Sequence, residues 1–232
     1  MKFAIFDIDG TLTDTTSVDD KSYFQAFAKT FDKDISSTDW DKITHVTDWG
    51  IAEELIDLHL NRRAESSDYD NLKKDLLYFL KLERDNDINQ FQSITGSNSF
   101  VNELMASSDF EIGIATGAWK ESARIKLEAS IIDIDSVCSA TSSDCKSRVD
   151  ILKKVIQDMS TELGHAPEHI VYFGDGTWDY HTCRELDIDF IGIDFHQNQK
   201  LKSLGAPYVF QDFQDAKSIQ SAMEALLLQN RH

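Results

Sequence analysis

Cysteine, proline and long hydrophobic runs are scarce in this chain of 232 residues. It has three cysteines and two prolines. The cysteines, at positions 138, 145 and 183, are odd in number and form no C-x-x-C pair, which argues against a disulfide framework and indicates reduced thiols. No apolar run approaches the roughly 20 residues of a membrane span, and the short run after Lys2 is too brief for a signal peptide. We therefore expect a cytoplasmic protein without a membrane partner.

Positive charge is also scarce. Lysine and arginine together number 23, against 41 aspartates and glutamates, so the formal net charge is −18. Such a surface repels nucleic acids and anionic membranes, which argues against both as main partners. It also repels an anionic substrate. Any phosphate site therefore needs a local positive charge from a metal ion, a lysine or the N-terminus of a helix.

What the chain does contain is an alternation of strand-like and helical segments. Short apolar runs predict strands, and helical patterns lie between most of them. The predicted strands span residues 3–6, 112–115, 134–138, 170–173, 190–193 and 208–210, and the predicted helices span 118–129, 148–159, 178–186 and 216–228. This order predicts an α/β fold in which helices cover both faces of a parallel sheet.

Residues 15–89 interrupt this alternation. They contain no proline and no convincing strand. Helical patterns occur instead at residues 17–31, 49–62 and 69–84. We predict an all-helical inserted domain over residues 15–89, and a core domain made of residues 1–14 and 90–232.

Two carboxylates and a Gly-Thr turn follow the first predicted strand, in the stretch MKFAIFDIDGTLTD. Asp7 and Asp9 are separated by one residue, so their side chains leave the strand end on the same side. Two crowded carboxylates repel each other. Their pairing is explained if a divalent cation lies between them, or if one is a nucleophile while the other handles protons.

Three further predicted strands end in polar residues suited to a phosphate site. They are Thr116 and Gly117 after the second strand, Lys146 and Arg148 after the third, and Asp175 and Asp179 after the fourth. Sites in open parallel sheets form at the carboxyl ends of the strands. We therefore expect these residues to gather around the two carboxylates of the first strand.

These residue types suit phosphoryl transfer. Asp7 would attack the phosphorus and form an aspartyl-phosphate, and Asp9 would protonate the leaving oxygen and then activate water. The carboxylates of Asp7 and Asp175, with the backbone carbonyl of Asp9, would hold Mg²⁺, which prefers oxygen ligands.

The remaining residues would handle the charge of the phosphate. Thr116 and the backbone N–H groups that follow it, including that of Gly117, would bind phosphate oxygens at a helix start. Lys146 would screen the charges of nucleophile and phosphate, and Arg148 is the alternative source of that charge. Each position also has a structural interpretation: Thr116 as a helix N-cap, Lys146 as a solvated lysine, and Asp179 as a carboxylate favoured early in a helix.

The order of these motifs resembles that of the haloacid dehalogenase superfamily of hydrolases. The resemblance rests on D-x-D-G-T-L-x-D at residues 7–14, the strand-borne Thr116, the Lys146 region, and G-D-G-x-x-D at residues 174–179. It implies a Rossmann-like core that uses Mg²⁺, with a helical cap that closes over the site. Residues 15–89 look like such a cap, inserted directly after the first motif.

Two positions distinguish branches of that family. Its phosphatases carry a second acid, present here as Asp9, whereas its dehalogenases and phosphonate-cleaving members typically lack one. Related sugar-phosphate mutases tend to have a histidine in the first cap helix, where this chain has Asp19. Many members follow the motif lysine with proline, but Ser147 follows Lys146 here. The resemblance therefore implies a phosphatase and leaves a mutase open.

The cap of such enzymes usually selects the substrate. The expected specificity segment is residues 44–50, in which Thr47 is our candidate substrate contact, although it could instead cap the following helix. We predict hydrolysis of a small phosphorylated metabolite. The alternatives are a phosphomutase of a sugar phosphate and a non-catalytic binding or regulatory protein that kept the fold. The sequence predicts no particular oligomeric state.

Overall fold

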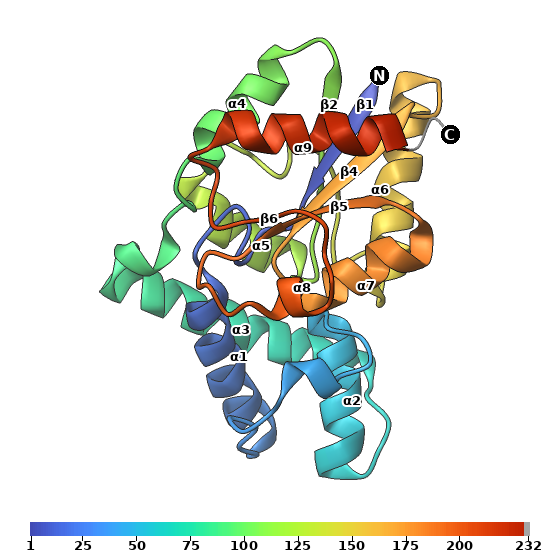
Figure 1. Cartoon of the computed structure of the whole chain (residues 1–232). Coiled ribbons are helices and arrows are strands. Elements are labelled where there is room, and N and C mark those ends of the chain that lie inside the picture. The colour runs from blue at the N-terminus through green and yellow to red at the C-terminus, as the bar shows by residue number, and fades with distance from the viewer. Residues whose placement is uncertain (230–232) are drawn as a thin grey trace.

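A single parallel sheet of six strands forms the centre of the protein (Figure 1). The computed structural model describes residues 1–229. The strands lie in the order β3-β2-β1-β4-β5-β6. Their bounds are β1 Lys2–Phe6, β2 Phe110–Ala115, β3 Cys138–Ala140, β4 His169–Gly174, β5 Asp189–Ile193 and β6 Val209–Phe210. The predicted α/β architecture with a parallel sheet is confirmed.

Helices cover both faces of this sheet because β1 is apolar on both sides. Ala4 and Phe6 pack against α4 (Ser97–Ala106) and α9 (Ala216–Gln229) on one face. Phe3 and Ile5 pack on the other face, against α6 (Arg148–Leu163), α7 (Thr177–Leu186) and α8 (Lys200–Ser203). A strand that is buried on both faces lies in the middle of the sheet. The residues that directly follow β1 therefore emerge at the centre of its carboxyl edge.

Several predicted elements have other bounds in the structure, and two of them show why. The strand expected at residues 134–138 begins only at Cys138, because β3 pairs with Gly113–Ala115 of β2 and the preceding Ile134 is buried in a turn. The helix expected at residues 118–129 is shorter: α5 spans Lys120–Lys126 and continues as the 3-10 helix η3 (Leu127–Ala129). In both cases the apolar pattern identified residues that are buried. It did not predict the backbone hydrogen bonds that define the strand and the helix.

Three helices from residues 15–89, called the cap below, lie together beyond the carboxyl edge of the sheet, in blue to cyan in Figure 1. They are α1 (Thr16–Phe31), α2 (Asp48–Leu60) and α3 (Ser66–Asn86), with the 3-10 helices η1 (Trp40–Lys42) and η2 (Ile88–Phe91) between and after them. A buried cluster that includes Phe27, Leu55 and Leu76 joins the cap helices, and Trp119 and Ile125 of the core belong to the same cluster. The division into domains at residues 14 and 90 stays a prediction.

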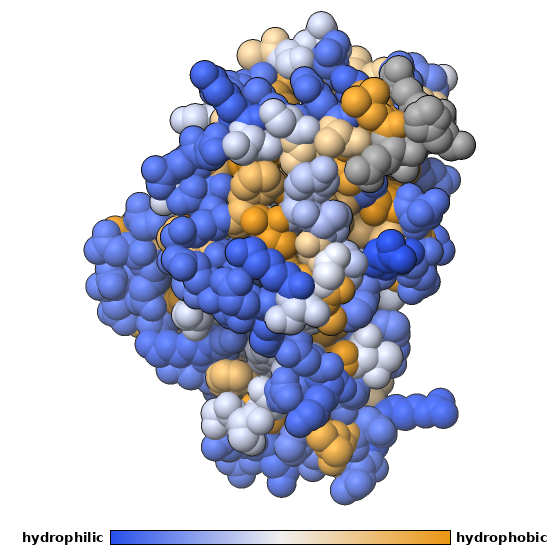
Figure 2. All heavy atoms as spheres, viewed as in Figure 1, coloured by the Kyte–Doolittle hydropathy of each residue, from blue (hydrophilic) through white to orange (hydrophobic). Residues whose placement is uncertain are grey.

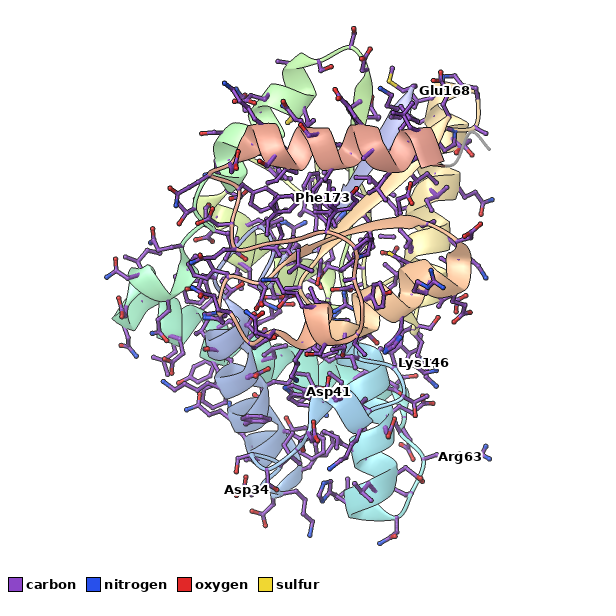
Figure 3. All side chains as sticks on the ribbon, viewed as in Figure 1. Asp34, Asp41, Arg63, Lys146, Glu168 and Phe173 are labelled. Carbon is purple, nitrogen blue, oxygen red and sulfur yellow. The ribbon has the colours of Figure 1, made fainter. Side chains whose placement is uncertain are left out.

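The cap is closed onto the core. Asp41, on η1, accepts hydrogen bonds from Lys200 Nζ at 2.6 Å and from Thr177 Oγ1 at 2.9 Å (Figure 3). The start of α2 is held in the same way, because the backbone N–H of Asp48 donates to the carbonyl of Gly117 at 2.8 Å. These contacts enclose the carboxyl edge of the sheet beneath the cap.

Hydrophilic residues dominate the face of the molecule seen in Figure 2, and hydrophobic residues appear there only in small patches. No helix within residues 1–229 is long and apolar enough to span a membrane.

Candidate active site

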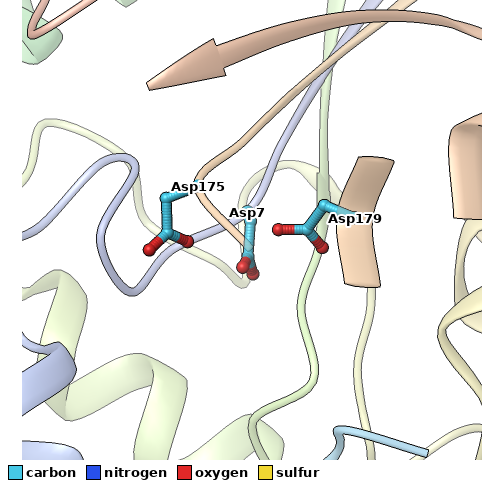
Figure 4. Close-up of side chains that lie close together, drawn as sticks. All are labelled: Asp7, Asp175 and Asp179. Carbon is cyan, nitrogen blue, oxygen red and sulfur yellow. The ribbon is translucent and has the colours of Figure 1, made fainter. Parts of the chain in front are cut away.

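Three carboxylates from separate segments meet at the carboxyl edge of the sheet (Figure 4). Asp7 follows β1, Asp175 follows β4, and Asp179 lies in the first turn of α7. Oxygen atoms of the three lie within 4.8 Å of one another. Asp7 is held in place by its backbone N–H, which donates to the carbonyl of Phe173 at 2.9 Å. The sequence placed Asp7 and Asp175 in one metal site; Asp179 is the third carboxylate, whose role the sequence left open.

The three carboxylates of this cluster repel one another, and a bound cation would relieve this repulsion. Burial, together with the negative charges of Asp179 and Asp7, raises the pKa of Asp175 well above its ordinary value. Burial also raises the pKa of Asp179, to about 7, although Arg148 opposes the shift. Asp7 is only 2% exposed, and its Oδ1 has no hydrogen-bond partner within the described chain. Buried oxygens of this kind fit the ligand set of a hard divalent ion such as Mg²⁺.

Gly10 explains why the motif needs glycine after Asp9. Its φ of +75° lies in the left-handed region, which favours glycine. A Cβ atom at this position would lie 2.1 Å from Oδ2 of Asp175. The turn therefore leaves the space that the Asp175 carboxylate occupies.

Arg148, at the start of α6, supplies the positive charge beside Asp7. Its Nη1 lies 3.2 Å from Asp7 Oδ2 and 3.2 Å from Asp179 Oδ1. Burial alone would lower the pKa of this guanidinium, but Asp7 and Asp179 outweigh it and raise the pKa. The Nε of Arg148 also donates to the carbonyl of Val46 in the cap, at 2.9 Å. One buried side chain thus contacts the catalytic edge and the cap.

Lys146 lies elsewhere, at the junction of core and cap (Figure 3). Its ammonium forms an ion pair with Glu53 of α2, and 40% of its side chain is exposed. No ion pair joins Lys146 to Asp7, whereas Arg148 has one. Of the two residues left open by the sequence, Arg148 therefore has the position from which to screen the charge of Asp7.

Asp9 points toward a buried lysine that the sequence analysis did not single out. Lys126, on α5, is 0% exposed, and its Nζ lies 2.7 Å from Asp9 Oδ2 and 2.6 Å from Asp19 Oδ1. The other Asp9 oxygen accepts a hydrogen bond from Thr15 Oγ1 at 2.6 Å. Lys126 and Thr15 thus contact both oxygens of the Asp9 side chain, and the backbone carbonyl of residue 9 as a metal ligand stays a prediction.

Substituting Lys126 with methionine is expected to destabilise the protein. The change leaves Asp9 and Asp19 buried without their cation, and removal of one partner from a buried ion pair costs about 3–5 kcal/mol. Denaturation in urea should show a loss of about 3 kcal/mol in the free energy of unfolding. The control is Lys120→Met on the same helix, whose partly exposed ion pair with Asp135 is worth at most about 1 kcal/mol. Equal losses in the two variants would contradict a buried, charged Lys126.

The predicted phosphate-binding residues lie at the end of β2. Thr116 is 1% exposed, and its hydroxyl accepts a hydrogen bond from the backbone N–H of Ala118 at 3.3 Å. A Cβ on Gly117 would lie 2.7 Å from a guanidinium nitrogen of Arg148, so only glycine leaves room for this arginine.

Thr47, the predicted substrate contact in the cap, caps α2. Its hydroxyl accepts a hydrogen bond from the N–H of Gly50 at 3.0 Å and donates one to the carbonyl of Lys146 at 2.6 Å.

A pocket lies between the carboxyl edge and the cap. Its lining brings together most of the residues expected from the sequence. The lining from the core includes Asp7, Asp9, Gly117, Arg148, Asp175 and Trp178, and the lining from the cap includes Asp19, Asp20, Tyr23, Trp40, Thr47 and Asp48. Lys146 is not among the lining residues.

The comparison with known families agrees with this arrangement. A sequence model of the family described as haloacid dehalogenase-like hydrolase matches residues 4–193. The chain belongs to this family. It is therefore a hydrolase of the haloacid dehalogenase superfamily, as the motif order predicted.

Solved structures share the fold of this haloacid dehalogenase-like hydrolase. A hydrolase from Pseudomonas syringae has a TM-score of 0.74 at 17% identity, over 96% of this chain and 99% of that chain. A predicted phosphoglycolate phosphatase from Haemophilus somnus has a TM-score of 0.64 at 14% identity, over 95% and 98%. A protein assigned as a β-phosphoglucomutase from Bacteroides vulgatus has a TM-score of 0.68 at 14% identity, over 98% and 90%. No curated protein matches this chain at a significant level.

A signal for Lys126 was nonetheless present in the sequence of this haloacid dehalogenase-like hydrolase. Lys126 follows Ala118 and Ser122 at intervals of four residues, and both are buried. A lysine on the buried stripe of a helix calls for an anionic partner. The partner itself could not be read from the sequence, because Asp9 and Asp19 lie more than 100 residues away in the chain and reach Lys126 only in the folded protein.

Proposed function

We propose that this hydrolase is a Mg²⁺-dependent phosphatase that hydrolyses a small phosphomonoester through an aspartyl-phosphate on Asp7. The observation that carries the proposal is the Asp7 carboxylate, which is buried at the end of the central strand, lines the pocket, and has one oxygen without a hydrogen-bond partner among the described residues. A carboxylate in this state is suited to attack. Because the cap encloses the pocket, the substrate would be a small metabolite.

The reaction would proceed in two displacements at phosphorus. A carboxylate oxygen of Asp7 attacks the phosphorus, the bond from phosphorus to the ester oxygen breaks, and Asp9 donates a proton to the departing alcohol. Water then attacks the phosphorus of the aspartyl-phosphate while Asp9 accepts its proton. Cleavage of the bond between phosphorus and the Asp7 oxygen releases phosphate and restores both carboxyl groups.

Charge compensation would come from two sources. The carboxylates of Asp7, Asp175 and Asp179, with the backbone carbonyl of Asp9, would hold Mg²⁺. When bound, this ion supplies the positive charge that lets an anionic nucleophile approach an anionic phosphate. Arg148 would contribute a fixed positive charge on the other side of Asp7.

Thr116 and the backbone N–H group of Gly117 would bind the phosphate oxygens at the end of β2, while the N–H of Ala118 donates to the Thr116 hydroxyl. Gly117 lines the pocket, which supports this role. Thr47 lines it as well, but its hydroxyl already bonds Gly50 and Lys146, so its contribution to substrate binding would be to hold the start of α2 in place.

The test is phosphate release from a panel of phosphomonoesters, including p-nitrophenyl phosphate, with Mg²⁺ or with a chelator. We expect release with Mg²⁺ and a fall of at least about 100-fold without it, since a catalytic metal contributes several kcal/mol to transition-state stabilisation. Borohydride reduction of enzyme quenched during turnover should convert Asp7 to homoserine, detected by peptide mass.

Chelator-resistant activity would overturn the metal dependence. Isomerised sugar phosphate without free phosphate would indicate a mutase, and no turnover together with a specific protein partner would indicate a binding module.

A further inference from the structure

The wall of the pocket that the cap forms carries acidic and aromatic side chains. Asp19, Asp20 and Tyr23 of α1, Trp40 of η1 and Asp48 of α2 line it. The alcohol part of a phosphomonoester attached at Asp7 would extend toward this surface. That the pocket takes a ligand rests on separate evidence, the buried and unpartnered Oδ1 of Asp7 on its opposite wall.

The positively charged side chains at this pocket already form ion pairs with aspartates of the protein. Of the described residues that line it, Arg148 alone is a lysine or arginine, and its guanidinium lies against Asp7 and Asp179. Lys126 lies behind the lining, is 0% exposed, and contacts Asp9 and Asp19. Neither cation is directed at the position of the alcohol.

Two carboxylates of the cap, Asp20 and Asp48, form no ion pair with a described lysine or arginine. Asp20 accepts a hydrogen bond from Trp40 Nε1 at 3.0 Å, and Asp48 accepts one from the backbone N–H of Trp119 at 2.6 Å. Within residues 1–229, neither carboxylate has a lysine or arginine within ion-pair distance. Burial, opposed for Asp20 by the Trp40 hydrogen bond and for Asp48 by Lys126, raises the pKa of each to about 6. Each carboxylate is thus held by neutral hydrogen-bond donors.

We propose that the alcohol part of the substrate carries no negative charge and is a neutral polyol or an amine. This inference rests on the proposed phosphatase activity. A carboxylate or a second phosphate on the alcohol would face Asp20 and Asp48 with no free cation beside it, and like charges in a poorly solvated site repel strongly. An ammonium group or a hydroxylated chain is accommodated instead, because carboxylates accept their hydrogen bonds and aromatic rings such as Tyr23 and Trp40 attract cations. The site would thus discriminate against phosphoglycolate and bisphosphates.

The experiment compares small esters that differ in one group. Phosphoethanolamine, 2-hydroxyethyl phosphate and phosphoglycolate share a two-carbon alcohol, and glycerol 3-phosphate and 3-phosphoglycerate form a second matched set. Their inhibition constants against p-nitrophenyl phosphate hydrolysis are measured with Mg²⁺, so that each ester is ranked whether or not it is turned over. We expect each carboxylate-bearing ester to bind at least about tenfold more weakly than its neutral or cationic partner.

A charge-neutralising variant tests the cause. Asp20→Asn retains an acceptor for Trp40 Nε1 and removes the charge, so the discrimination against carboxylates should fall by about threefold or more. The control is Asp34→Asn at the far end of the cap, an exposed position (Figure 3), where the ratio should be unchanged.

The outcomes separate the two proposals. If p-nitrophenyl phosphate is hydrolysed and the carboxylate-bearing esters bind as well as the matched neutral or cationic esters, the inference about the alcohol is wrong. The proposed phosphatase activity is then retained. An unchanged ratio in Asp20→Asn would also remove the cap acids as its cause. If no phosphate ester is hydrolysed, the proposed function itself fails.

Discussion

Asp7→Asn is expected to lower kcat by at least about 1,000-fold on every phosphate ester that the wild type hydrolyses, because the amide is a poor nucleophile and removal of a covalent nucleophile has effects of this size or larger. The protein should remain folded, since asparagine has nearly the same shape and the backbone N–H of residue 7 still donates to Phe173. In the absence of metal, its melting temperature should rise, because a cluster of three closely spaced carboxylates becomes one of two.

The control for Asp7→Asn is Asp14→Asn in the same motif. The Asp14 side chain is 37% exposed, pairs with His196 and does not line the pocket. This variant should retain activity within about twofold, as expected for a surface substitution. Full activity in Asp7→Asn, with fold and metal binding intact, would exclude Asp7 as the nucleophile.

Arg148→Met is expected to lower kcat/KM by about 100- to 1,000-fold, the range seen when one preorganised charge-stabilising donor is lost. The variant should also lose about 3 kcal/mol in the free energy of unfolding, because Asp7 and Asp179 stay buried without their cation. Arg148→Lys should recover part of the activity, since a lysine supplies the charge but not the planar fork that contacts both carboxylates and Val46. Initial rates and urea denaturation of the purified variants measure both effects.

Lys146→Met separates the two candidate cations. The ion pair between Lys146 and Glu53 has both side chains about 40% exposed, and such pairs are worth at most about 1 kcal/mol. Activity should therefore stay within about threefold of the wild type. If Lys146→Met were the inactive variant and Arg148→Met the active one, the lysine would be the screening residue.

The two carboxylates that follow the first strand, Asp7 and Asp9, could be identified from the sequence because their arrangement is local. A buried strand ends at Phe6, and the spacing of Asp7 and Asp9 at its end is fixed by the backbone over three residues. Asp175 and Asp179 follow β4 in the same local way. The parallel order of the strands then brings these ends together, which the alternation of strands and helices predicts.

The choice between Lys146 and Arg148 was not accessible in this way. The two residues are separated only by Ser147, which caps α6 with its side chain. Arg148 turns toward Asp7 because Gly117, on a different strand end, has no side chain to exclude the guanidinium. Lys146 turns toward Glu53 because the cap is folded over the core. Both directions depend on neighbours that are about 30 and 90 residues away in the chain.

By itself, the sequence determined the parallel α/β sheet, the helical nature of the insert and the identity of the two leading carboxylates, because periodicity and spacing act over a few residues. The tertiary structure decided which cation accompanies each of them: Arg148 for Asp7 and Lys126 for Asp9. It also decided the acidic and aromatic character of the pocket surface at the cap. Buried charges must find partners wherever the fold provides them, and these partners come from segments more than 100 residues apart that meet only in the folded core.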